Sequence, residues 1–300
     1  MGEVLDQGAL ATYLAKRTEW FSWFENPDEP NAIQTQIHLM LLSEMSARVL
    51  IEERRHVTPT NFAFAPVLTH LIDSGYFSSQ ILAIRRLFDT RPDVISLRRV
   101  LDDLKKSKLL LTREIFVSFD GTPYEPQTPA LEKQGFQYTA SPFSNYSIAI
   151  QRHERFDSLS KVKADKRTRF DRIHDDIFAR LNQWMETSRA QPLIKVSHKY
   201  LAHAAEQSAL QNVSPSGLSF AEVEAIQRAI VRVTRAIFDI ILNSGVHSEV
   251  VPDTPLGFFG QVWEGGNLVL STSRMQAYWD EMKIERNSWL KNLEKDLCGN

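Results

Sequence analysis

Apolar residues recur at intervals of three and four along most of the first 245 residues, which is the period of an amphipathic helix. The first two segments of this kind are residues 4–24 and 31–56, separated by the helix-breaking stretch Asn26-Pro27-Asp28-Glu29-Pro30. They predict two antiparallel helices. A third helix is expected over residues 76–89, directly after Gly75, with one apolar stripe made by Phe77, Ile81, Ile84, Leu87 and Phe88.

Two later helices begin at residues that typically cap a helix N-terminus. Ser96 precedes a regular apolar set, formed by Leu97, Val100, Leu101 and Leu104. Ser219 and Glu222 form a capping-box pattern before a long run of isoleucines and valines, which ends at Asn243-Ser244-Gly245. The second pattern predicts a long helix in the core.

The helical period is lost between residues 116 and 150. This stretch contains four prolines, and it is too rich in aromatic residues for a disordered linker. A structureless loop of this length is uncommon in a compact domain, so we expect an ordered insertion that packs on the helices. Its rings fit either a hydrophobic cover or a platform for unpaired RNA bases, and we favour the cover; examples are Tyr124, Tyr138, Phe143 and Tyr146.

The composition changes again after residue 245. Residues 258–271 carry the adjacent glycines Gly265 and Gly266 between apolar stretches, which predicts a small β-hairpin with a glycine turn, and a terminal helix is expected over residues 273–295. We therefore expect an all-α, up-and-down helical bundle over residues 1–245, with the aromatic insertion at about 116–150. A C-terminal extension over residues 246–300 adds the hairpin and the helix.

Composition narrows the class of protein. The chain has 300 residues, is 43% hydrophobic and carries a net charge of −2, so it can bury a full core and is no general binder of polyanions. Its single cysteine, Cys298, excludes an internal disulfide framework. No apolar run reaches the roughly 20 residues of a membrane span, and residues 1–23 do not look like a secretory signal. We expect a cytoplasmic protein with no membrane partner.

Charged residues are unevenly distributed. Residues 152–199 hold 12 Lys and Arg against 7 Asp and Glu. The stretch 152–172 fits a track for a phosphate backbone or a solvated face, and the interleaved acidic residues favour the solvated face. Arg86 and Asp89 are expected to form a local ion pair at a helix end. We expect no metal and no cofactor, because no cluster has metal-ligand spacing and no glycine-rich phosphate loop is present.

One segment combines titratable and cationic residues. Residues 195–203 read Lys-Val-Ser-His-Lys-Tyr-Leu-Ala-His and follow Gln191-Pro192, which suits the start of a helix. On that helix Lys195, Lys199 and His203 stack at intervals of four along one border. An imidazole beside two ammonium groups fits a phosphate site and fits a solvated helix edge equally well.

Three motifs, in this order, resemble the HEPN superfamily, and within it the branch named for abortive-infection U proteins of bacteria. Arg86-Leu87-Phe88-Asp89, followed by Ser96-Leu97, is similar to that branch's Arg-Leu-x-Asp and Ser-Leu sequence. Lys199-Tyr200-Leu201-Ala202-His203 is similar to its Lys-x-x-Ala-His signature. The helix expected over residues 220–242 falls where the family's last bundle helix does. The resemblance covers most of residues 1–245.

The resemblance implies an RNA-directed protein of bacterial defence or of a toxin–antitoxin pair. It implies RNA, a second copy in a homodimer and a partner or antitoxin protein as binding partners. Members with the full signature carry an arginine, a spacer of about four to six residues and then the histidine, and they form a metal-independent ribonuclease site shared across a dimer. In this chain that implies His203 as the acid/base, because histidine titrates near neutrality.

The arginine itself is missing. Val196, Ser197 and His198 occupy its positions, and none of them supplies a guanidinium group. Lys199 is the expected catalytic cation, with Lys195 and His198 as further phosphate or RNA contacts. Two hypotheses remain: a ribonuclease that uses these substitutes, and a non-catalytic HEPN-like module that acts through protein partners or regulation. A sensor of nucleotides or other small molecules is a third, which the sequence does not separate from them.

Overall fold

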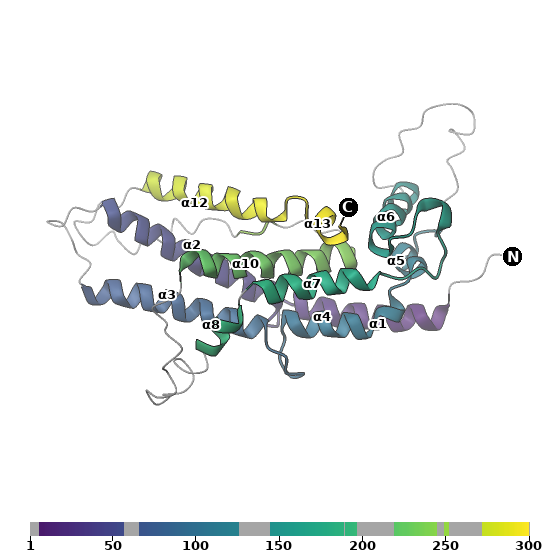
Figure 1. Ribbon diagram of the computed structural model, residues 1–300, viewed down its shortest axis with the longest axis horizontal. Helices are drawn as coiled ribbons and strands as arrows, with labels where there is room; N and C mark the ends of the chain where they lie inside the picture. Colours follow the sequence, from purple (N-terminus) through teal and green to yellow (C-terminus); the bar gives the residue numbers. More distant parts are fainter. Residues whose placement is uncertain are drawn as a thin grey trace, which may run out of the picture.

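The computed structural model describes residues 6–56, 66–125, 145–188, 190–196, 219–244, 249–251 and 272–299. All its longer elements are helices, drawn in Figure 1: α1 (Gln7–Phe24), α2 (Ile33–His56), α3 (Pro66–Leu87), α4 (Leu97–Lys106), α5 (Arg113–Ser118), α6 (Asn145–Ser160), α7 (Asp175–Thr187), α8 (Ala190–Val196), α10 (Phe220–Arg235), α12 (Thr272–Asn287) and α13 (Leu293–Cys298). Short helical turns add η2 (Lys108–Leu110), η4 (Ala164–Lys166), η7 (Ala236–Ile241) and η8 (Ser288–Leu290).

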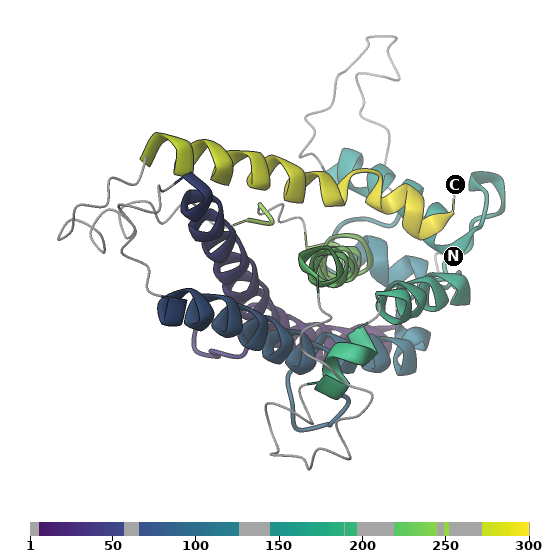
Figure 2. The ribbon, with the colours of Figure 1, turned by 60° about the vertical axis from the view of Figure 1, so that its left-hand side comes forward.

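Helix α10 forms the centre of the bundle. In Figure 2 it is seen nearly end-on, with α12 above it and α3 and α7 on other sides. Its apolar stripe is fully buried and includes Val223, Ile226, Ile230 and Val233. The predicted long core helix is confirmed. Its last turns widen into the π-helix η7, where the Leu242 N–H donates to the Ile237 carbonyl five residues back.

Local capping explains where these helices begin. The Ser219 Oγ accepts from the Glu222 N–H at 3.2 Å, and the Glu222 carboxylate accepts from the Ser219 N–H at 2.9 Å, which completes the predicted capping box. Ser96 caps α4 in the same way by accepting from the Arg99 N–H at 3.1 Å. Asn243, at the predicted helix end, adopts a φ of 48°, which stops the helical hydrogen-bond ladder.

Helix α3 differs from its prediction at its start. It begins at Pro66, so Gly75 lies inside the helix instead of before it. A Cβ built on Gly75 would meet no atom within 4 Å, so the position is open to solvent and needs no special backbone conformation. The helix continues through Gly75 because one glycine lowers helix stability by only about 1 kcal/mol, and packing of α3 against α2 compensates for this loss.

The aromatic insertion is shorter than predicted. Helices α5 and α6 take up its two ends, and Phe116 of α5 packs on Phe156 of α6 with ring centroids 5.2 Å apart. Tyr124 lies edge-on to His153 of α6 at 4.8 Å, so this ring covers the bundle. Residues 126–144, and with them Tyr138 and Phe143, lie outside the described part of the chain.

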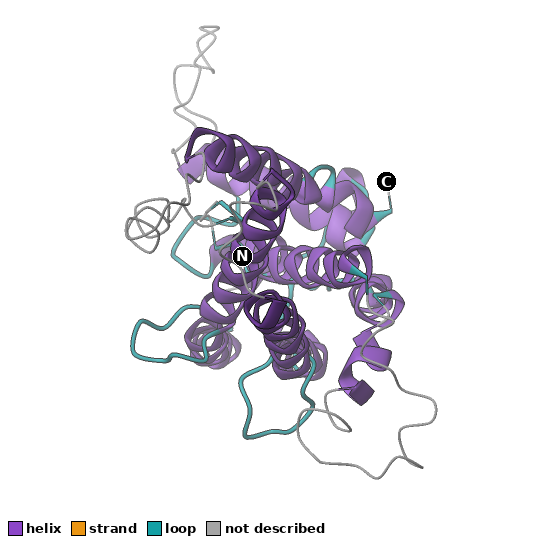
Figure 3. Cartoon of the chain, turned by 90° about the vertical axis from the view of Figure 1, so that its left-hand side faces the viewer, coloured by secondary structure: helices purple, strands orange, loops and turns teal. Residues whose placement is uncertain are grey.

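The all-α class is confirmed. Figure 3 draws helices and loops, and within the described ranges the only β-type pairing is an isolated bridge between Thr112 and Arg172. The hairpin predicted at residues 258–271 lies outside those ranges. The predicted terminal helix is present as α12, η8 and α13. Among the described residues, no helix combines the length and the apolar character that crossing a bilayer requires.

Candidate functional site

Only the first of the predicted site residues falls within the described chain. Lys195 belongs to α8, and its side chain is not described. His198, Lys199 and His203 lie outside the described residues. The structure therefore defines the helix that leads into the predicted site, together with the elements that hold it.

Helix α8 is anchored on α3 and α7. Ala190 and Leu193 are buried, and Ile194 packs against the same core. Gln191 and Pro192 are exposed on the other side. The backbone of Lys195 thus belongs to a helix that is fixed to the bundle.

The turn between α3 and α4 holds the first family-like motif. Asp89 accepts two hydrogen bonds from the Arg91 side chain, at 3.1 Å from Nε and 2.9 Å from Nη2, and these bonds lower the pKa of Asp89. The predicted pairing of Arg86 with Asp89 is therefore wrong. The carbonyl of Asp89 also accepts from the buried Ser96 hydroxyl at 2.6 Å. Asp89 and Ser96 of this motif thus close the turn between α3 and α4.

Arg86 instead faces a shallow cavity between α2 and α3. The cavity has a volume of about 280 Å³ and is lined by apolar and amide side chains, among them Leu39, Leu82, Gln36 and Gln80. Arg86 is exposed and has no ion-pair partner among the residues that the structure describes. The guanidinium of Arg86 thus lies beside apolar side chains, but no acid/base group lines the cavity.

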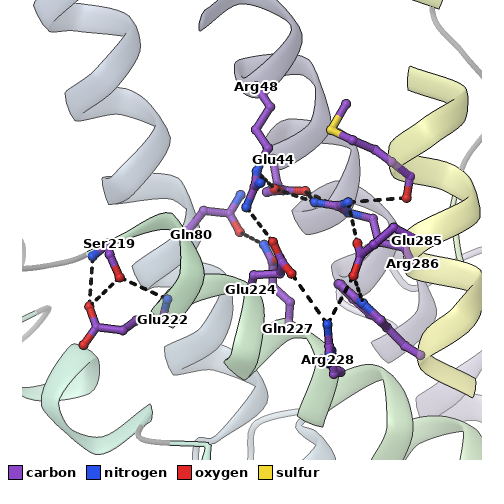
Figure 4. A network of polar contacts seen from close by, with 12 residues as sticks. Glu44, Arg48, Gln80, Ser219, Glu222, Glu224, Gln227, Arg228, Glu285 and Arg286 are labelled. Atoms are coloured by element: carbon purple, nitrogen blue, oxygen red, sulfur yellow. Dashed lines mark hydrogen bonds and ion pairs between the residues drawn. The ribbon is translucent and has the colours of Figure 1, made fainter. Parts of the chain in front are cut away.

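A buried polar network connects α2, α10 and α12 and is drawn in Figure 4. Arg286 of α12 binds both carboxylate oxygens of Glu44 on α2 at 2.8 Å, and both side chains are nearly inaccessible to solvent. Arg48 binds Glu224 of α10 at 2.8 Å and also contacts Glu44. Burial raises the pKa of Glu44, while Arg286 and Arg48 act in the opposite direction.

The network continues through uncharged amides. Gln227 Nε2 donates to Gln80 Oε1 at 2.8 Å, and Gln80 Nε2 donates to the Met40 carbonyl at 3.0 Å. At the other end, Arg228 contacts Glu285 at 3.2 Å (Figure 4). Because acids and bases are paired within the core, the arrangement locks helices together and leaves no group poised for acid/base chemistry.

A second buried cluster surrounds Arg113 at the start of α5. Its fully buried guanidinium donates to Asp171 and Asp157, each at 2.8 Å, and to the Ser160 hydroxyl at 3.2 Å. His153 lies beside it and donates from Nε2 to the Tyr124 carbonyl at 2.8 Å. Burial lowers the pKa of His153, so the ring stays neutral at physiological pH. Its Nδ1 is buried without a hydrogen-bond partner.

The two clusters were not predicted from the sequence. The sequence signal that could have revealed them is a charged residue on the apolar face of a helix, such as Glu44 between Leu41 and Met45. Residues 152–172, which were predicted to form a solvated face, do so only in part. Several of their arginines bind acidic side chains on other elements. Among the described residues, no group of three or more His, Cys, Asp or Glu is arranged to hold a metal ion.

The comparisons with known proteins agree with the sequence motifs. The HEPN-family model of AbiU2 matches residues 34–254. No curated protein and no solved structure matches the chain. The matched range includes α2, α3, α4, the histidine segment and α10, while α1, α12 and α13 lie outside it. Since the match spans most of the chain and the described fold is all-α, the chain belongs to the AbiU2 family of HEPN proteins, an abortive-infection type of HEPN module.

Proposed function

We propose that this chain is an RNA-directed defence protein that cleaves RNA without a metal ion. His203 is the acid/base, Lys199 contacts the phosphate in flight, and Lys195 and His198 bind neighbouring phosphates. The observation that supports the proposal is the family match, because its range contains residues 195–203, where the chain has the sequence Lys199-Tyr200-Leu201-Ala202-His203.

The reaction suited to these groups is an internal transfer. Neutral His203 removes the 2′-OH proton, the 2′-oxygen attacks the adjacent phosphorus, and the bond to the 5′-oxygen breaks as that oxygen takes up a proton from water. His203 then releases its own proton to the solvent. The products are a 2′,3′-cyclic phosphate and a free 5′-hydroxyl group. An ammonium group on Lys199 stabilises the added negative charge on the phosphoryl oxygens, although as a point charge it orients phosphate less strictly than an arginine does.

The described structure supports the proposal through α8. This helix is fixed on α3 and α7 by Ala190 and Leu193, so the segment that follows starts from a rigid base. Catalytic groups held on rigid elements lose little of their effect to motion. We further propose a cytoplasmic homodimer in which two such segments share one groove, and a partner or antitoxin protein that controls it.

Purified protein incubated with tRNA and mRNA in excess chelator tests the proposal. We expect cleavage products that end in a 5′-hydroxyl, and His203→Ala should lower the rate at least 100-fold, as about 10²–10⁴-fold is typical for a lost acid/base group. His38→Ala is the matched control, because His38 is an exposed histidine on α2. Intact RNA with the wild-type protein, or equal rates for His203→Ala, sinks the proposal.

The missing arginine favours a second candidate, a non-catalytic module that acts through protein partners or as a regulatory subunit. Val196, Ser197 and His198 stand where the motif arginine is expected. Under this alternative, neither Ser197→Arg nor His198→Arg creates cleavage. A gain of chelator-resistant cleavage in either variant, abolished again by His203→Ala, would argue against the alternative and for a conserved catalytic geometry.

A further inference from the structure

The loop that joins α6 to α7 presents an aromatic ring to solvent. Phe170, in the middle of the stretch 161–174, is 66% exposed. We call residues 161–174 the basic loop, since it holds six lysines and arginines against two aspartates. An exposed phenylalanine by itself is unremarkable on a protein surface. Phe170 differs from such a residue because it lies on a rigid and positively charged loop.

Hydrogen bonds from Arg113 and Glu114 hold the basic loop in place. The Arg113 N–H donates to the Asp171 carbonyl at 2.9 Å, and its Nε donates to the Asp171 carboxylate at 2.8 Å. The Glu114 N–H donates to the Arg169 carbonyl at 3.1 Å. Thr168 donates to Asp171 from its N–H at 3.0 Å and from its hydroxyl at 2.7 Å. Both neighbours of Phe170 are therefore tied to the body of the protein while its ring is exposed.

Half of the cations in the basic loop are already engaged. Lys161 pairs with Asp176, Arg167 with Asp157, and Arg169 with Glu114. The remaining three are exposed and form no ion pair with an acid of the described residues: Lys163, Lys166 and Arg172. Of the two acids in the loop, Asp171 is committed to Arg113, which leaves Asp165. The loop thus carries unneutralised positive charge on both sides of Phe170.

We propose that the basic loop is a binding surface for single-stranded RNA, separate from the segment around His203. The Phe170 ring stacks on one unpaired base, and Lys163, Lys166 and Arg172 contact the flanking phosphates. A single strand is required because the face of a base is accessible to a protein ring only when the base is unstacked. Stacking on an aromatic ring does not depend on the edge of the base, so the surface accepts any base.

This inference rests on the proposed function in one respect: it takes RNA as the substrate. It adds the location on the protein at which the RNA strand is held before and during cleavage. Ring stacking holds an RNA strand without chemistry, so the surface contributes to binding and leaves the chemical step unchanged.

Fluorescence anisotropy with a labelled single-stranded RNA of about 12 nucleotides tests the inference, a length within the usual range for such surfaces. The full chain carries His203→Ala in every sample, so that no strand is cleaved. Phe170→Ala should weaken binding about five- to hundredfold, and Phe170→Trp should retain it. Ile284→Ala is the matched control, because it removes another apolar side chain that is 72% exposed, and it should bind like the parent.

The charge contribution is measured separately. Arg172→Gln should reduce the slope of log affinity against log salt by about 0.7, the value for one phosphate contact on a single strand. Arg55→Gln, which alters an exposed arginine of α2 that pairs with Glu52, should leave the slope unchanged. A slope unaltered by Arg172→Gln, or affinities of Phe170→Ala and its parent within twofold, overturns the inference.

Two further outcomes separate this inference from the proposed function. If RNA binds through Phe170 but the wild-type chain never cleaves it, the proposed function fails and the surface stands. If His203-dependent cleavage occurs and Phe170→Ala leaves the KM for RNA unchanged, the inference about the basic loop is wrong and the proposed function stands. Phe170-dependent binding to phosphatidylserine vesicles, with no binding to RNA, assigns the loop to a membrane and overturns the inference as well.

Discussion

Arg286 and Glu44, which are 242 residues apart in sequence, form a bidentate ion pair in the core, with both Nη2–Oε distances at 2.8 Å. The side chain of Arg286 is 2% exposed and that of Glu44 is 0% exposed. The pair joins α12 to α2, although α12 lies beyond the range that matches the family. A second pair between the same helices, Arg274 with Glu53 at 2.7 Å, reinforces the joint. Helix α12 is thus held by ion pairs to α2, a helix within the range that matches the family.

Removing Arg286 should strongly destabilise the fold. Arg286→Met leaves Glu44 buried with only Arg48 beside it, and breaking a buried pair by removing one partner costs about 3–5 kcal/mol. Urea unfolding followed by circular dichroism measures the loss. The double variant Glu44→Leu/Arg286→Met should recover most of it, because two apolar side chains need no pairing. A double variant less stable than Arg286→Met contradicts this explanation.

Arg113 should control the order of the basic loop. Arg113→Met removes the donors to Asp157, Asp171 and Ser160, and we expect a loss of about 3 kcal/mol in the free energy of unfolding. Trypsin should then cut within residues 161–174 at low protease concentration, where the wild-type loop resists. Arg98→Met is the control, since its pair with Asp102 is partly exposed and contributes less than about 1 kcal/mol. Equal proteolysis of wild type and Arg113→Met refutes the role.

His153 should make stability depend on pH. Burial lowers the pKa of this imidazole below its usual 6.5, and Arg167 and Arg113 lower it further. The unfolded chain therefore binds a proton that the folded chain does not. The contribution is complete above a pH of about 6.5 and is lost as the pH falls through the lowered pKa.

Urea midpoints measured across this pH range check the prediction. His153→Gln should flatten the dependence below a pH of about 6.5, whereas His38→Ala, at an exposed position, should retain the wild-type slope. The opposite result, a wild-type slope in His153→Gln, would assign the pH dependence to other groups.

Ser96 should contribute to stability by closing the turn that follows Asp89. Its hydroxyl donates to the Asp89 carbonyl at 2.6 Å and accepts from the Arg99 N–H at 3.1 Å. Ser96→Ala removes both bonds at a fully buried position, so we expect a cost of about 1–2 kcal/mol in thermal or urea unfolding. Ser107→Ala, at the other end of α4, should change little, because Ser107 makes no side-chain cap.

The accuracy of the sequence predictions followed the range of the interactions involved. The caps at Ser96 and Ser219 were predicted correctly because each depends on residues within one helical turn. The start of α3 was placed too late, at residue 76 instead of Pro66, since a single glycine does not by itself end a helix. The partner of Asp89 was also misassigned, because a turn of the backbone brings Arg91 nearer than the helical neighbour Arg86.

The sequence by itself determined the helical class and the family, since periodicity and short motifs are local, and it supplied a prediction of the site residues. The tertiary structure alone decided which charges are buried and what they pair with. The sequence places Glu44 on the apolar face of a helix but does not identify its partner, and only packing brings Arg286 to Glu44 and Asp171 to Arg113. A buried charge is tolerated when a distant partner compensates its desolvation, and such a partner has no signature in the local sequence.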